Sequence, residues 1–117
     1  MKITIRLAAL LLAATVLPVS AQDDSLAGER LYQENCASCH GANLEGQPDW
    51  RSRLPNGRLP APPHDASGHT WHHTDRVLLD IVKRGTAAIV GNGYESDMPG
   101  FKEVLTDEEI TAIIDYI

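Results

Sequence analysis

The sequence predicts an all-α domain of about three helices joined by long loops. Three segments show the apolar periodicity of amphipathic helices, and no segment alternates polar and apolar residues as a half-buried strand does. The stretch 41–70, between the first two of these segments, holds five of the seven prolines. An irregular loop of this length is uncommon inside a small domain, so we expect it to pack against a bound group.

The first helix is expected from about Ser25 to Cys39, with Asp24 or Ser25 as its N-cap. The small Gly28 and the aromatic Tyr32 lie four positions apart and therefore share one face. A glycine on a helix face lets another helix approach closely. We expect a helix crossing at this face.

The second helix is expected from Asp75 to Arg84. Thr74 precedes it as N-cap, and Gly85 follows two basic residues as its terminator. Both ends agree with the apolar periodicity of the segment, whose inward residues are Leu78, Ile81 and Val82.

The third helix is expected to begin at Thr106, where Thr106 and Glu109 have the spacing of a capping box and Leu105 can pack against Ile110. An apolar stripe follows on Ile110, Ile113, Ile114 and Ile117. The sequence reaches Ile117 without a helix cap or a basic last turn, so we expect the C-terminal helix to be truncated here.

Residues 1–21 have the pattern of a secretory signal peptide. Lys2 and Arg6 precede the apolar stretch 7–19, and Val19-Ser20-Ala21 ends in the small residues that signal peptidase accepts. An uncleaved anchor is the alternative, but the apolar stretch is shorter than the roughly 20 residues that span a bilayer. We expect export to the periplasm, cleavage after Ala21, a single domain over residues 22–117, and no stable membrane anchor.

The charge of the chain is acidic. The full sequence has a formal net charge of −6, and removal of Lys2 and Arg6 makes the remainder more negative. An acidic surface argues against a nucleic-acid partner and favours protein partners with basic patches, because opposite charges accelerate encounter.

The decisive motif is Cys36-Ala37-Ser38-Cys39-His40, which contains both cysteines of the chain. The pattern C-x-x-C-H is the attachment signature of c-type haem. Two thiols on one helical turn reach the two vinyl groups of a porphyrin, and the adjacent imidazole is then directed at the iron. The alternatives are a structural disulfide, a redox-active pair and a zinc site. No βαβ pattern or second C-x-x-C supports the last two.

Three helices, the early C-x-x-C-H motif and a Met-Pro sequence far downstream resemble class I cytochrome c over residues 24–117. The resemblance implies the fold of that family and a single covalently bound haem c. It also implies that His40 and Met98 are the two axial ligands of the iron, since Met98-Pro99 stands in an irregular loop before the last helix. The helix crossing implied by the family fits Gly28, Tyr32 and Tyr116.

The resemblance further implies residues of the haem environment. A backbone carbonyl of Pro62 or Pro63 is expected to accept a hydrogen bond from the proximal histidine, although the segment 44–59 makes this spacing longer than in compact members of the family. Trp71 is expected either to cover a haem edge and donate to a propionate or to plug the loop. Tyr94 or Asn92 is expected to bond the methionine sulfur or to form a surface turn.

Four more histidines fall within ten positions, and ordinary small cytochromes do not require them. They suggest either a second site, for copper or zinc, or solvated residues that bond loop carbonyls and propionates. These residues are His64, His69, His72 and His73.

The sequence therefore predicts a one-electron carrier rather than an enzyme. Its partners are expected to be redox proteins, among them membrane-bound respiratory or dehydrogenase complexes. One alternative is an accessory module of a larger redox enzyme, linked to copper handling through the histidines. A haem enzyme or gas sensor with an open iron site is a further alternative, which requires that Met98 leave the iron.

Overall fold

The computed structural model describes residues 22–117, and within this range it contains helices and loops but no strand. The elements are α1 (Gln22–Asn35), α2 (Ala37–His40), the 3₁₀ helix η1 (Thr70–His72), α3 (Asp75–Arg84), α4 (Thr86–Val90) and α5 (Asp107–Tyr116). The predicted all-α class is confirmed. The expected signal segment, residues 1–21, lies outside the described residues.

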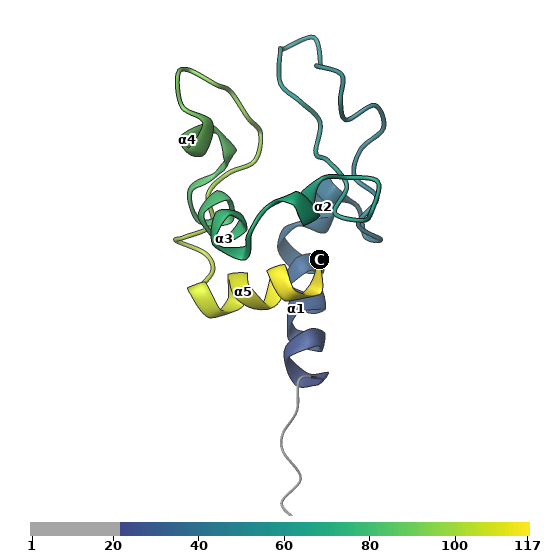
Figure 1. Cartoon of the computed structure of the whole chain (residues 1–117), viewed down its shortest axis with the longest axis vertical. Helices are drawn as coiled ribbons and strands as arrows, with labels where there is room; N and C mark the ends of the chain where they lie inside the picture. Colours follow the sequence, from purple (N-terminus) through teal and green to yellow (C-terminus); the bar gives the residue numbers. More distant parts are fainter. Residues whose placement is uncertain (1–21) are drawn as a thin grey trace, which may run out of the picture.

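The core lies where α1 and α5 cross, low in the view of Figure 1. Tyr32 and Ile110 are fully buried there, and Leu31, Leu105, Ile113 and Ile114 complete the buried cluster. Gly28 permits this approach, because a Cβ atom at its position would lie 2.1 Å from the backbone oxygen of Ala112. Tyr32 packs against Tyr116 with ring centroids 5.5 Å apart. The crossing expected at Gly28, Tyr32 and Tyr116 is therefore observed.

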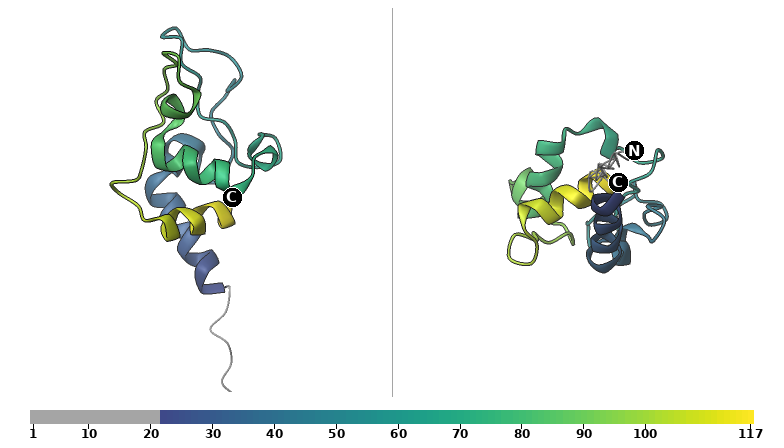
Figure 2. Two further views of the ribbon diagram at one scale, coloured as in Figure 1. Left: turned by 60° about the vertical axis from the view of Figure 1, so that its left-hand side comes forward. Right: turned by 90° about the horizontal axis from the view of Figure 1, so that it is seen from below.

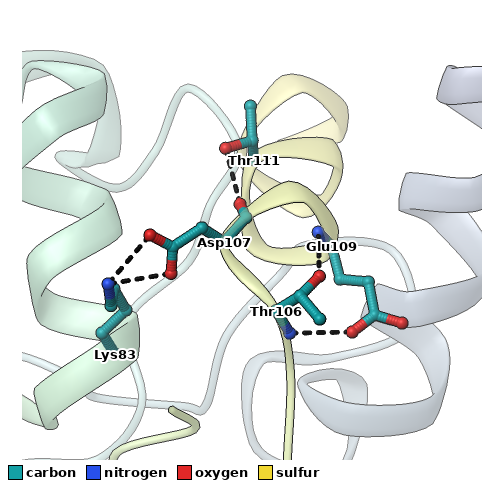
Figure 3. Close-up of polar contacts among 5 residues, drawn as sticks. All are labelled: Lys83, Thr106, Asp107, Glu109 and Thr111. Carbon is teal, nitrogen blue, oxygen red and sulfur yellow. Dashed lines mark hydrogen bonds and ion pairs between the residues drawn. The ribbon is translucent and has the colours of Figure 1, made fainter.

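The second predicted helix matches α3 at both ends. The Thr74 side chain accepts a hydrogen bond from the backbone N–H of Val77, and Gly85 follows Arg84 with a φ of 82°. A positive φ is readily adopted by glycine because it has no Cβ atom, so the helix stops at this residue. Lys83, in the last turn of α3, forms an ion pair of 2.8 Å with Asp107 at the start of α5 (Figure 3).

The start of α5 also follows the sequence. Thr106 Oγ1 accepts from the N–H of Glu109 at 3.2 Å, and the Glu109 carboxylate accepts from the N–H of Thr106 at 2.9 Å. Figure 3 shows these two bonds closing the capping box on one side of the chain and the Lys83 ion pair on the other. The staple residues Leu105 and Ile110 both lie in the buried cluster.

The first helix differs from its predicted bounds. Helix α1 begins at Gln22, before either expected cap residue, and ends at Asn35 rather than at Cys39. Cys36 then leaves the regular helix with φ −120° and ψ −35°, and α2 starts at Ala37. The break occurs at Cys36, inside the cysteine motif. The apolar periodicity of the sequence could not predict it, because periodicity does not depend on the backbone angles of a single residue. The sequence reading also missed η1 and α4, which are too short to show a period.

Two loops extend to the same side of the crossing, as both Figure 1 and the left view of Figure 2 show. We call residues 41–69 the proline-rich loop and residues 91–105 the methionine loop. The first connects α2 to η1, and the second connects α4 to α5. None of the helices within residues 22–117 is both long and apolar enough to cross a membrane.

We expect Gly28→Ala to lower the free energy of unfolding by about 1–3 kcal/mol, as overpacking does. On a free helix surface the same change would stabilise the helix by roughly 0.5–1 kcal/mol, so the sign of the effect reports the crossing. Urea unfolding measures it. The exposed neighbour provides a control, since Glu29→Ala should change stability by less than about 0.5 kcal/mol. A stabilised Gly28→Ala protein would contradict a close approach of α1 and α5.

Candidate haem site

The two cysteines of the motif are both free thiols. Cys36 is half-buried at the end of α1, and Cys39 is exposed on α2. The backbone N–H groups of Cys39 and His40 donate to the Cys36 carbonyl at 3.1 and 2.9 Å. These bonds hold the motif in one tight turn. Burial raises the pKa of the Cys36 thiol to about 11, with a further contribution from Cys39. Cys36 is thus protonated at neutral pH.

His40 is buried, and its orientation is fixed by one hydrogen bond. Its Nδ1 lies 2.8 Å from the carbonyl oxygen of Pro62. The carbonyl can only accept, so Nδ1 carries the proton and Nε2 keeps its lone pair. Burial lowers the pKa of His40, while the bond to Pro62 acts in the opposite direction. The neutral imidazole that results is the form that binds a metal.

Of the two candidate prolines, the structure brings Pro62 and not Pro63 to the histidine. Pro63 instead lies between two glycines: a Cβ atom at Gly46 would lie 2.4 Å from the Pro63 nitrogen, and one at Gly68 would lie 2.1 Å from its carbonyl oxygen. Close backbone contacts on both sides hold Pro63 in place. These contacts place the preceding carbonyl against His40.

The backbone that follows His40 is held by two further bonds. The Tyr32 hydroxyl donates to the carbonyl of Gly41 at 2.7 Å, and the N–H of Gly46 donates to the carbonyl of His40 at 2.7 Å. Burial is the main reason that the pKa of Tyr32 is raised well above its usual value, so the phenol stays a proton donor. The Tyr32 side chain therefore links the buried core to the backbone directly after His40.

The four other histidines do not assemble into a metal site. His64 stacks on His40 with ring centroids 4.2 Å apart, and its Nδ1 lies 2.7 Å from Thr70 Oγ1. His69 stacks on Trp50 and His72 on Trp71. No group of three potential metal-ligating side chains occurs in the part of the chain that the structure describes.

His64 behaves as a packing residue beside the motif. Burial, with the neighbouring His40 and His69, lowers its pKa to about 4, so the imidazole is neutral. A neutral ring stacked on His40 covers one side of its imidazole without adding charge. Nothing in the spacing of the histidines indicated that one of them would lie against the motif.

Met98 lies half-buried in the methionine loop. Its N–H donates to Ser96 Oγ at 3.1 Å, and its sulfur accepts from the hydroxyl of Thr86 at 3.4 Å. Thr86 is the first residue of α4, which the sequence reading missed. In the described part of the chain, neither Tyr94 nor Asn92 forms a hydrogen bond with the Met98 sulfur.

The loop around Met98 is pinned to the end of α3. The N–H groups of Phe101 and Lys102 donate to the carbonyls of Val82 and Lys83 at 2.9 and 3.3 Å. A Cβ atom at Gly85 would lie 3.0 Å from the Met98 carbonyl oxygen. These contacts fix where the loop returns toward α5.

Trp71 is 68% exposed, and its indole N–H donates to the carbonyl of Gly68 at 3.2 Å. It lines a cavity of about 720 Å³ together with His64, Leu78 and Ile117. The side chain therefore borders a space beside the stacked histidines rather than plugging the loop.

The family model described as cytochrome c matches residues 25–117. The chain belongs to the cytochrome c family. Family membership gives it one covalently bound haem c and a role in electron transfer with redox partners. The residues described above fit that group, because two free thiols, a neutral oriented imidazole and a thioether sulfur are the donors that c-type haem uses.

Three curated relatives resemble this cytochrome. Cytochrome c-555 of Prosthecochloris aestuarii is 45% identical over 106 residues, covering 82% of this chain and 87% of that protein. The nitrite reductase of Stutzerimonas stutzeri is 25% identical over 114 residues, covering 92% of this chain but only 18% of that protein. Cytochrome c-550 of Virgibacillus halodenitrificans is 61% identical over 23 residues, covering 20% of this chain and 66% of that protein. No solved structure matches the chain significantly.

We expect the variant that combines Cys36→Ala with Cys39→Ala to lose its haem completely on denaturing extraction, because no thioether can form. Each single variant should keep one thioether and retain haem. Ser38→Ala changes the exposed residue between the thiols and serves as the control. Haem staining after denaturing electrophoresis, with the intact mass, measures the outcome. Haem that stays with the double variant would contradict attachment at this motif.

Proposed function

We propose that the chain is an exported one-electron carrier whose haem iron is bound by His40 and Met98. The observation that carries the proposal is the bond between His40 Nδ1 and the Pro62 carbonyl, which leaves Nε2 as a fixed donor. Met98 supplies the second donor, and the sequence has no other methionine than Met1. A soft, neutral thioether suits ferrous iron, and with both axial positions filled no site is left for a substrate.

The two thiols hold the group covalently. When haem is bound, the S–H of each cysteine would add across one vinyl double bond, with the sulfur on one carbon and the hydrogen on the other, so that no group leaves. The bound haem then supplies the one-electron chemistry of its iron. The chain supplies position and environment: the Pro62 carbonyl orients His40, His64 packs against it, and the Thr86 hydroxyl lies at the Met98 sulfur. An acceptor bonded to the ring N–H raises the basicity of the ligand.

Trp71 and Tyr94 are proposed to contribute less directly. The exposed ring of Trp71 lines the cavity beside His64, and the indole N–H would have to exchange its bond to Gly68 to reach a propionate. The ring centroid of Tyr94 lies 6.0 Å from the Arg53 guanidinium carbon. Tyr94 is thus proposed to stabilise the loop rather than the sulfur.

Export is part of the proposal. Residues 1–21 carry the basic start, apolar stretch and small-residue end of a signal peptide, and thioether attachment suits a compartment outside the cytoplasm. We propose the periplasm as the site of function. Membrane-bound respiratory or dehydrogenase complexes are the partners we propose, and the acidic charge of the chain favours basic docking patches on them.

A second candidate function follows from one comparison. The nitrite reductase relative matches nearly all of this chain with less than a fifth of its own length. Domains of this kind thus occur within a larger redox protein, and this chain would then deliver electrons as an accessory subunit. The histidines add no support for a link to copper, since the described residues hold no group of three metal ligands.

Met98→Ala tests the ligand assignment and with it the choice between a carrier and an open-site enzyme. The wild-type protein should be low-spin in both oxidation states and bind carbon monoxide slowly. The variant should bind carbon monoxide rapidly in the ferrous state, because water is displaced more easily than sulfur. Its reduction potential should be lower, because a hard oxygen ligand stabilises ferrous iron less than the soft sulfur does. Stopped-flow mixing and a redox titration measure both.

Val90→Ala is the matched control, since Val90 is 51% exposed at the end of α4, directly before the methionine loop. It should behave as wild type in both measurements. A wild-type protein that is high-spin, or that binds carbon monoxide as fast as Met98→Ala, would show that Met98 is not a ligand of the iron. That result would favour an enzyme or a sensor.

A further inference from the structure

The proline-rich loop and the methionine loop meet at one ion pair. The guanidinium of Arg58 bonds the carboxylate of Asp97, which lies 39 positions later in the sequence. Within residues 22–117 no other hydrogen bond or ion pair joins these two loops. Near this pair, the Arg53 guanidinium carbon lies 6.0 Å from the ring centroid of Tyr94. Asp97 directly precedes Met98 in the sequence.

Where Met98 lies, the methionine loop packs closely against Gly85 at the end of α3 but forms few hydrogen bonds. Residues 95–100 make no backbone–backbone hydrogen bond, and the next such bond links Phe101 to Val82. Apart from the local bond from Met98 N–H to Ser96, the polar contacts of this stretch are those of Thr86 with the sulfur and of Arg58 with Asp97. A segment with few backbone bonds opens locally at low free energy. Each of its side-chain contacts therefore affects how often it opens.

Arg58 itself stands on a well-bonded turn. The N–H of Leu54 donates to the Arg58 carbonyl at 2.8 Å, and the N–H of Gly57 donates to the Leu54 carbonyl at 2.8 Å. The Asn56 side chain accepts from the N–H of Arg58 at 3.0 Å, and Arg53 donates to the Gly57 carbonyl at 2.7 Å. The turn is thus stabilised by its own hydrogen bonds, and the Arg58 guanidinium bonds Asp97 outside it.

The base of the same loop is also braced. The N–H of Gln47 donates to the carbonyl of Ala61 at 2.9 Å, and the Gln47 side chain accepts from the N–H of Ala61 at 3.1 Å. Ala61 directly precedes Pro62, whose carbonyl orients His40. The braced segment therefore touches both sides of the site: Pro62 on the His40 side and Arg58 on the Met98 side.

We propose that Arg58 is a positioning residue for Met98, because its ion pair with Asp97 ties the methionine loop to the braced proline-rich loop and slows release of the sulfur from the iron. The proposal rests on the His40 and Met98 ligation proposed above. It assigns a role to the segment 44–59, which lengthens the chain between His40 and its carbonyl partner.

The size of the effect follows from the exposure of the pair. The two side chains are 36% and 54% exposed, so solvent screens their attraction and the contribution is modest. We expect loss of the pair to speed release of Met98 by about two- to fivefold. The difference should become smaller near 1 M salt, where the Debye length falls to about 3 Å and the attraction between the two charges is weakened.

The experiment uses the exported, haem-loaded protein in the ferrous state, mixed with saturating carbon monoxide so that release of Met98 limits the rate. Arg58→Met removes the charge and keeps an unbranched side chain. Arg30→Met removes the same charge from an exposed ion pair with Glu34 on α1 and is the matched control. We expect faster binding for Arg58→Met at low salt, and no change for Arg30→Met.

A charge swap separates the ion pair from a general packing effect. Arg58→Asp should bind carbon monoxide faster than wild type, and combining it with Asp97→Arg should restore the slow rate, since the cycle isolates the pairwise contribution. A rate for Arg58→Met equal to wild type at low salt would overturn the proposal. So would an equal acceleration by Arg30→Met, or an acceleration for Arg58→Met that does not decrease at all as salt is raised.

Failure of this proposal is distinguishable from failure of the ligand assignment. If wild-type protein binds carbon monoxide as fast as Met98→Ala, Met98 is not the ligand and both proposals fall. If wild-type protein binds slowly and Arg58→Met binds equally slowly, only the role of Arg58 falls.

Discussion

The close crossing of α1 and α5 at Gly28 is the constraint on which the haem-binding segment depends. Six residues form a buried apolar cluster at this crossing. Tyr32 is fully buried in it, and its hydroxyl bonds the Gly41 carbonyl at 2.7 Å, directly after His40. Because α1 leads into the cysteine motif, the position of the two helices fixes the position of the thiols and of His40, the proposed proximal ligand. The core of this small domain is thus also the support of its cofactor.

The two sides of the proposed iron site are held by different means. On the proximal side, His40 is buried, bonded to Pro62 and stacked on a second neutral imidazole, His64. On the side of Met98, the loop lacks backbone hydrogen bonds over residues 95–100 and depends on side chains from α4 and from the proline-rich loop. Of the two proposed ligands, His40 is therefore the more firmly held. Local opening, where it occurs, should expose the iron on the methionine side.

The features that the sequence predicts well are those coded within a few residues. Thr74 and Gly85 set the ends of α3, and the capping box at Thr106 sets the start of α5, because capping is a local interaction. The sequence could not decide whether Pro62 or Pro63 bonds His40, because the answer depends on the packing of Pro63 between two glycines that are far apart in the sequence. The contacts of Thr86 with Met98 and of Arg58 with Asp97 join separate segments, and no periodicity marks them. The same holds for the stacking of His64 on His40.

In the ligation proposed here, this fold places one nitrogen and one sulfur from the chain on a single haem iron. X-ray absorption at the iron edge of the purified, oxidised protein tests it most directly, because sulfur and nitrogen scatter differently at different distances. We expect one sulfur in the first coordination shell, from Met98, beside the porphyrin nitrogens and the nitrogen of His40. A shell of nitrogen alone, or of nitrogen with one oxygen and no sulfur, would contradict it.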